Sequence, residues 1–163
     1  MASAQQGQAN TGFTLQIRRT FAVPRERVFA AWAEREQLEK WMCRDVSAHV
    51  ITHHVQDIRT GGGYLMKIHD PAKGETYRGK GDYLEVKPPE KIVFTWSWEK
   101  TEPHGSRTEM HPGSPETQVT VEFFACGNST EVVLTHGVFS STKLRDEHDD
   151  GWNGCFDVLA RVL

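Results

Sequence analysis

The sequence predicts an α+β protein in which a curved antiparallel sheet grips one long C-terminal helix. Two patterns lead to this fold class. Between residues 13 and 139, apolar and polar residues alternate in short runs separated by turn residues, as in half-buried strands. Residues 141–163 instead carry apolar side chains at spacings of three and four, which is the period of an amphipathic helix. A helix with so large an apolar face needs an apolar partner, and the strands supply it.

The first part of the chain predicts a disordered segment, a strand and two helical segments. Residues 1–12 are polar and lack both the basic and the apolar region of a signal peptide, so we expect disorder there. Residues 13–21 alternate as a strand does. Pro24 then suits the start of a helix, because its missing N–H would be unpaired there. A second helical segment follows over residues 34–42. The two segments are expected to bury Val28, Phe29, Trp32, Leu38, Trp41 and Met42.

Six further strands are predicted after the helical pair, at residues 49–59, 64–69, 75–86, 92–98, 119–123 and 132–136. Most of their connections are short and rich in Gly, Pro, Asn or Asp, which favours turns. Residues 99–116 show no periodicity and predict a long irregular loop. Successive strands joined by short turns predict an antiparallel meander with one covered face.

The composition fits one domain over residues 13–163. A formal net charge of -3 gives no electrostatic reason to expect nucleic acid or an anionic membrane as the main partner. No apolar run is long enough to span a membrane. Three widely spaced cysteines form no disulfide framework, which favours the reducing cytoplasm.

Five sequence segments in a fixed order resemble the SRPBCC group, which includes the START domains. They are Val28–Trp32, Arg59–Tyr64, Leu84–Trp96, Leu134–Phe139 and His148–Trp152. More narrowly, the chain resembles the branch of homologues of the activator of heat shock protein 90 ATPase. The resemblance covers residues 13–163. It implies the helix-grip fold, in which a seven-stranded antiparallel sheet wraps a C-terminal helix and leaves an apolar cavity between them.

The resemblance also implies three functions. Members of the group bind hydrophobic small molecules, and some are cyclases or hydrolases acting on polyketide-like or aromatic substrates. Stimulation of a chaperone ATPase is the third function, suggested by the name of the branch. The sequence lacks the additional N-terminal domain of full co-chaperones, which counts against a chaperone partner. We therefore expect first a hydrophobic small molecule as ligand, and a homodimer is left open.

Eleven side chains lie on the inferred inward faces of their elements and are candidates to contact a ligand. Pockets for small ligands are mainly apolar, with a few polar groups that fix orientation. The alternative is a solid core that these side chains simply fill. The candidates are Trp41, Tyr64, Met66, Phe94, Trp96, Trp98, Phe123, His136, His148, Trp152 and Phe156.

The two histidines in this set have two interpretations. An inward imidazole can orient a ligand or transfer protons near neutral pH, and in an enzyme His136, His148 or Tyr83 would be the acid or base. Alternatively, both histidines are hydrogen-bonded structural residues. No catalytic signature is complete, so the sequence identifies no catalytic residue. HExxH and paired CxxC motifs are absent, and adjacent His53 and His54 point to opposite faces of a strand, so we expect neither a metal site nor a cofactor.

Overall fold

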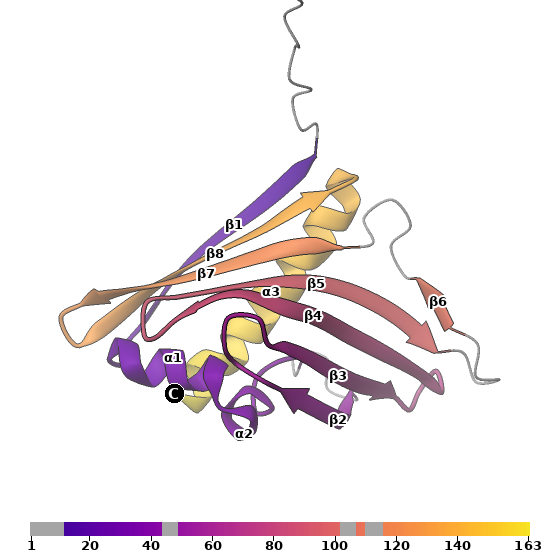
Figure 1. The fold of residues 1–163 in the computed structure, drawn as a ribbon, viewed down its shortest axis with the longest axis horizontal. Helices are drawn as coiled ribbons and strands as arrows, with labels where there is room; N and C mark the ends of the chain where they lie inside the picture. The colour runs from indigo at the N-terminus through magenta and orange to yellow at the C-terminus, as the bar shows by residue number, and fades with distance from the viewer. Residues whose placement is uncertain (1–11, 44–48, 102–106, 110–115) are drawn as a thin grey trace, which may run out of the picture.

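The computed structural model describes residues 12–43, 49–101, 107–109 and 116–163. The segment expected to be disordered, residues 1–12, lies outside this part of the chain except for Gly12. Within the described residues, a curved antiparallel sheet lies against one long helix (Figure 1). In chain order the elements are β1 (Phe13–Phe21), α1 (Arg25–Ala33), α2 (Arg35–Leu38), β2 (Val50–Gln56), β3 (Gly63–Asp70), β4 (Glu75–Lys87), β5 (Lys91–Thr101), β6 (Arg107–Glu109), β7 (Thr117–Cys126), β8 (Ser129–Phe139) and α3 (Thr142–Val162).

The order of strands across the sheet is β1-β8-β7-β5-β4-β3-β2. From β2 to β8 this is the predicted meander, with the short strand β6 set beside β5. The first strand β1 pairs with the last strand β8, from Phe13 opposite Phe139 to Phe21 opposite Thr130. The helical pair α1 and α2 connects β1 to β2, and these two strands form opposite edges of the sheet.

The predicted irregular loop at residues 99–116 is partly wrong. Strand β5 continues to Thr101, and β6 pairs with its end, from Glu99 opposite Glu109 to Thr101 opposite Arg107. The pairing of β5 with β7 ends at Trp96 opposite Thr117, which would leave the end of β5 as an open edge. Strand β6 covers this edge, so the described residues contain eight strands. A strand of three residues is too short to show alternation in the sequence.

The long helix α3 confirms the prediction for residues 141–163. The Ser141 hydroxyl accepts a hydrogen bond from the backbone N–H of Leu144 at 3.2 Å, an N-cap that fixes the start of the helix. From β1, the Arg19 guanidinium donates to Asp157 at 2.7 Å and to Asn153 at 3.0 Å, so this arginine ties the helix to the edge of the sheet. The buried side chains of the helix are Trp152, Cys155, Phe156 and Leu159.

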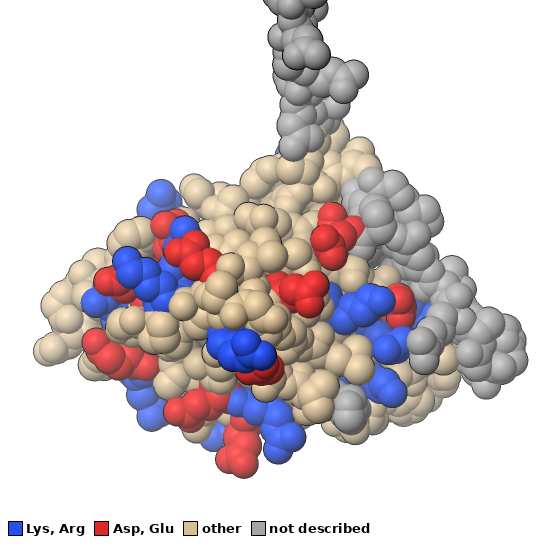
Figure 2. Space-filling view, in the orientation of Figure 1, with Lys and Arg blue, Asp and Glu red and all other residues tan. Residues whose placement is uncertain are grey.

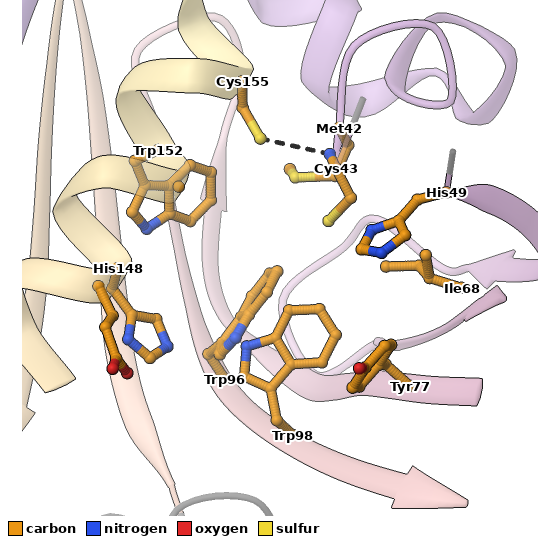
Figure 3. A pocket seen from close by; sticks show the side chains of 12 residues that line it. Met42, Cys43, His49, Ile68, Tyr77, Trp96, Trp98, His148, Trp152 and Cys155 are labelled. Atoms are coloured by element: carbon orange, nitrogen blue, oxygen red, sulfur yellow. Dashed lines mark hydrogen bonds between the residues drawn. The ribbon is translucent and has the colours of Figure 1, made fainter. Parts of the chain in front are cut away.

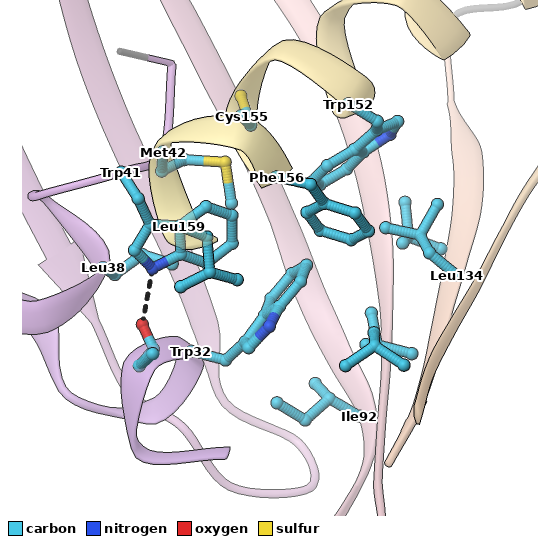
Figure 4. Packing of buried hydrophobic residues seen from close by; sticks show 14 of the residues in the cluster. Trp32, Leu38, Trp41, Met42, Ile92, Leu134, Trp152, Cys155, Phe156 and Leu159 are labelled. Atoms are coloured by element: carbon cyan, nitrogen blue, oxygen red, sulfur yellow. Dashed lines mark hydrogen bonds between the residues drawn. The ribbon is translucent and has the colours of Figure 1, made fainter. Parts of the chain in front are cut away.

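Helices α1 and α2 close one end of the space between the sheet and α3. The predicted second helical segment, residues 34–42, is helical only over Arg35–Leu38, and Trp41 and Met42 lie in the turn that follows. All six side chains that the sequence assigned to the interior are nevertheless buried. Figure 4 shows Trp32 and Trp41 packed beside Phe156 of α3. The two indoles meet edge to face at 4.7 Å between ring centroids, and Trp41 Nε1 donates to the Ala31 carbonyl at 2.9 Å. This end of the protein is closely packed, and the space of about 20 Å³ that Trp32 and Leu38 border is small.

Candidate functional site

A cavity of about 330 Å³ lies between α3 and strands β3, β4 and β5 (Figure 3). Its walls come from the residues after α2, from strands β3, β4 and β5, and from α3. It reaches the surface, because Trp98, Tyr77 and His148 are only half-buried and Glu147 is exposed. The cavity is lined by Met42, Cys43, His49, Ile68, Tyr77, Trp96, Trp98, Glu147, His148, Gly151, Trp152 and Cys155.

Two glycines help to shape the cavity. On β4, Gly79 lies opposite Trp98 of β5, and a Cβ atom at Gly79 would be 3.3 Å from the Trp98 ring. The glycine therefore lets the indole lie close to the neighbouring strand. On α3, a Cβ atom at Gly151 would meet no atom within 4 Å. Since Gly151 lines the cavity, its missing side chain leaves that space open.

The wall formed by the residues after α2 is attached to α3 through two cysteines. Cys43 has a φ of 55°, in the left-handed region, and its backbone N–H donates to Cys155 Sγ at 3.3 Å. A left-handed residue commonly ends a helical segment, and here it turns the chain toward α3. Both side chains line the cavity.

His136 links the helix to three strands through a chain of hydrogen bonds. Trp152 Nε1 donates to His136 Nδ1 at 3.0 Å, and an indole N–H can only donate, so Nδ1 carries no proton. His136 Nε2 therefore carries the proton and lies 2.6 Å from the Thr117 hydroxyl, which donates in turn to the Trp96 carbonyl at 3.3 Å. Both ring nitrogens are thus used to hold Trp152 and Trp96, two walls of the cavity, in place.

Burial also fixes the charge of His136. The side chain is fully buried, and desolvation, together with nearby His148, lowers the pKa of His136 from 6.5 to about 2. The imidazole is therefore neutral at physiological pH. This agrees with the structural interpretation of His136 that the sequence left open.

His148 differs from His136 because it lines the cavity. Its Nδ1 lies 2.8 Å from the Leu144 carbonyl oxygen, which can only accept, so Nδ1 carries a proton. The His148 ring packs 4.7 Å from Phe139 and 5.2 Å from His136, between ring centroids. Figure 3 shows the imidazole on the α3 side of the cavity, turned toward Trp96 and Trp98.

On the opposite wall, the polar atoms of Tyr77 and His49 are engaged with neighbours. The Tyr77 hydroxyl donates to Glu75 at 2.6 Å, and burial followed by this hydrogen bond raises the pKa of Tyr77 to about 12. His49 Nε2 lies 3.3 Å from Asp70. Burial alone would raise the pKa of Asp70, but hydrogen bonds from His49 and two backbone N–H groups lower it overall. The two rings lie 6.0 Å apart, so this wall is largely aromatic.

The structure divides the eleven sequence-predicted side chains among three places. Trp96, Trp98, His148 and Trp152 line the 330 Å³ cavity. Tyr64, Met66 and Phe94 border a separate space of about 20 Å³, which Trp96 also touches. The remaining four, all buried, line neither space, and a direct ligand contact for them stays a prediction. They are Trp41, Phe123, His136 and Phe156.

Eight lining residues were not among the predicted contacts. Met42, Ile68 and Cys155 lie on faces that the sequence does assign to the interior, so their pattern gave a usable signal. Tyr77, Glu147 and Gly151 show no such signal. Cys43 and His49 are brought to the cavity by the path of the chain after α2, which periodicity does not reveal.

Three further properties of the described residues concern surface charge, groups of metal-binding side chains and helices that could span a membrane. On the face shown in Figure 2, acidic and basic side chains are intermixed, in line with the small net charge. No group of three or more His, Cys, Asp or Glu in the described ranges could hold a metal ion. None of the helices described here is long and apolar enough to cross a membrane.

Comparisons with solved structures identify proteins of the same fold. Protein CV1439 from Chromobacterium violaceum aligns with a TM-score of 0.75 and 21% identity, over 93% of this chain and 97% of that chain. Mll3558 from Rhizobium loti aligns with a TM-score of 0.73 and 24% identity, over 93% and 96%. The AHSA1 protein SPO3351 from Silicibacter pomeroyi aligns with a TM-score of 0.74 and 24% identity, over 91% of this chain and 96% of that chain. At these identities the likeness shows the fold alone.

Sequence comparison identifies the family. No curated protein matches the chain significantly. The model of the family described as "Activator of Hsp90 ATPase homolog 1-like protein" matches residues 22–163, which include every described element except β1. The chain therefore belongs to the family of activator of Hsp90 ATPase homolog 1-like proteins.

Proposed function

We propose that this protein binds a hydrophobic small molecule in the cavity between the sheet and α3. One observation carries the proposal: the cavity of about 330 Å³ is walled by the indoles of Trp96, Trp98 and Trp152. Pockets for small ligands have volumes of about 300–1,000 Å³ and are mainly apolar with a few polar groups. Tyr77 and His148 supply such groups here.

The volume limits the size of the ligand. Water occupies about 30 Å³ per molecule in the liquid, so the cavity corresponds to roughly a dozen water-sized groups. A fused two-ring aromatic compound is of this size, whereas a long-chain lipid is larger. We therefore propose a compact and flat ligand.

A cavity-filling substitution tests the proposal. Isothermal titration calorimetry with 2-ethylnaphthalene is expected to give saturable binding to the wild-type protein. Gly151→Leu places a side chain in the open space on α3 and is expected to weaken binding by at least about tenfold, because ligand and side chain compete for the same volume. Helix stability should not fall, since glycine inside a helix costs about 0.5–1 kcal/mol relative to alanine.

Ala160→Leu is the matched control. It adds a leucine to the same helix at an exposed residue that does not line the cavity, and binding should not change. Absence of saturable binding to the wild type, or equal binding by the Gly151→Leu protein, would refute the proposed function.

The enzymatic alternative depends on His148. Of the three candidate acids or bases, His136 is a neutral structural residue and does not line the cavity. Tyr83 borders the 20 Å³ space, and burial raises its pKa to about 12. A cyclase or hydrolase acting in the larger cavity would use His148, so His148→Ala is the variant for a substrate screen. A cytoplasmic location stays a prediction, as does the expectation that no chaperone is the partner. A homodimer stays open.

A further inference from the structure

The indole N–H of Trp96 is a buried donor at the wall of the cavity. Trp96 is 7% exposed, and its Nε1 has no hydrogen-bond acceptor among the described residues. Buried donors are nearly always paired in native proteins, so an unpaired one needs a physical explanation. Two other buried indoles show the usual state: Trp41 Nε1 donates to Ala31, and Trp152 Nε1 donates to His136.

The position of this donor points to the cavity. Figure 3 shows the ring nitrogen of Trp96 on the edge of the indole that is turned toward His148. The nitrogen of Trp98 lies on the same side, and the two ring centroids are 5.1 Å apart. A second unpaired indole, Trp32, borders only the 20 Å³ space, which is large enough for about one water molecule. Trp96 is the unpaired buried indole that lines the cavity of ligand size.

The charges around the cavity limit the kind of acceptor. Among the described residues no lysine or arginine lines it, and Glu147 places a carboxylate at its exposed side. An anionic ligand would lose hydration there without gaining a cationic partner. Of the other donors in the wall, the Tyr77 hydroxyl donates to Glu75 and the Cys43 N–H donates to Cys155, whereas the Trp98 indole N–H lies on the same side as that of Trp96. The acceptor that fits is a neutral oxygen.

The shape of the walls limits the rest of the ligand. Trp96 and Trp98 meet nearly at right angles, at 76°, and Trp152 lies 5.6 Å from Trp96. Flat rings pack well against such indoles in stacked or edge-to-face contacts. We propose that the cavity selects a neutral aromatic ligand that bears a carbonyl oxygen, and that Trp96 Nε1–H donates a hydrogen bond to that oxygen. This inference rests on the proposed function.

Two probes of the same shape test this inference. 2-Acetylnaphthalene carries a carbonyl oxygen, and 2-ethylnaphthalene replaces it with hydrogen. Trp96→Phe keeps an aromatic ring in the wall and removes the donor. We expect Trp96→Phe to weaken binding of the ketone about tenfold and to change binding of the hydrocarbon by less than about twofold. Titration calorimetry of both proteins with both probes gives the four dissociation constants.

The wild-type protein provides a second measurement that does not depend on the stability of the variant. The sequence contains five tryptophans, so a ¹⁵N spectrum has five indole N–H signals to follow. The ketone should shift one signal strongly downfield, as a new hydrogen bond does, and the hydrocarbon should not. The inference would be overturned if Trp96→Phe weakened binding of both probes equally, or if the ketone shifted no indole N–H signal downfield. Either result would leave the proposed function intact. If neither probe binds the wild type, the proposed function itself fails.

Discussion

The two ends of the layer between the sheet and α3 contain the same kinds of side chain but differ in how they are packed. At one end, Trp32, Trp41 and Phe156 form a closely packed core. At the other end, Trp96 and Trp98 face a cavity of about 330 Å³. An aromatic residue on the inner face of an element is therefore no sign of a binding site by itself.

The helical pair explains the difference. Helix α1 inserts Trp32 and the turn after α2 inserts Trp41 between the sheet and α3, and these two rings fill the space at this end (Figure 4). Toward the other end, the wall of α3 includes Gly151, which has no side chain, and no atom lies within 4 Å of where its Cβ would be. Strands β4 and β5 continue past the end of β7 and leave their inner face over this gap. The cavity is thus the part of the layer that the side chains of α1 and α2 do not reach, and α3 forms one of its walls.

The largest effect is expected from truncation at the packed end. Trp41 is fully buried, so Trp41→Ala leaves a cavity and an unpaired carbonyl, and it should lower the free energy of unfolding by about 3–5 kcal/mol. Trp98→Ala removes a half-buried ring that already borders empty space, and the loss should be about 1 kcal/mol. Urea denaturation of the two variants measures the difference. Equal losses would mean that the two ends do not differ in packing.

A smaller change in the free energy of unfolding is expected from pH, because the neutral imidazole of His136 accepts a hydrogen bond from Trp152 of α3. The pKa of His136 is about 2 in the folded protein and near 6.5 in the unfolded chain. The unfolded state therefore binds a proton first as pH falls. The stability from neutral His136 is fully present above pH 6.5 and is lost below it, by about 2 kcal/mol at pH 5. His136→Gln should be less stable at pH 7 but lose less between pH 7 and pH 5 in urea titrations. An unchanged slope in this variant would exclude His136 as the cause.

The smallest effect involves the reactivity of a thiol. Cys43 is half-buried in the wall of the cavity, whereas Cys126 is exposed and does not line it. A ligand in the cavity should shield Cys43 and not Cys126. With 2-ethylnaphthalene at ten times its dissociation constant, alkylation of Cys43 by iodoacetamide should slow about tenfold, in proportion to the unoccupied fraction. Peptide mass spectrometry follows both sites in one sample, and equal slowing at both would place the ligand elsewhere.

Sequence patterns predicted most of the fold. The alternation in the last two strands placed Val119, Val121 and Leu134 inside, and all three are fully buried. The spacing in residues 141–163 predicted α3 to within a residue at each end. The pattern failed at β6, because three residues cannot show a period and the strand forms only where β5 lacks another partner.

The candidate site was predictable in part. Periodicity identifies the face on which a side chain lies but not what stands opposite, so the helical spacing at Trp41 and the alternation at Trp98 predicted only that both face inward. Their positions differ because α1 and α2 cover only one end of the layer, and this depends on the tertiary path of the chain. Tyr77 and Gly151 came to the cavity in the same way, through pairing and packing with distant segments.

The pairing of the first strand with the last affects how this chain folds during synthesis. Residues of β1 find their partners in β8 more than a hundred positions later in the sequence, from Phe21 with Thr130 to Phe13 with Phe139. Contacts of such long range slow folding, because a long loop must close before they form. On the ribosome, β1 is synthesised more than a hundred residues before its partner β8. Its apolar face is exposed during that time, so the nascent protein has a period of vulnerability to aggregation that ends only when β8 and α3 are released.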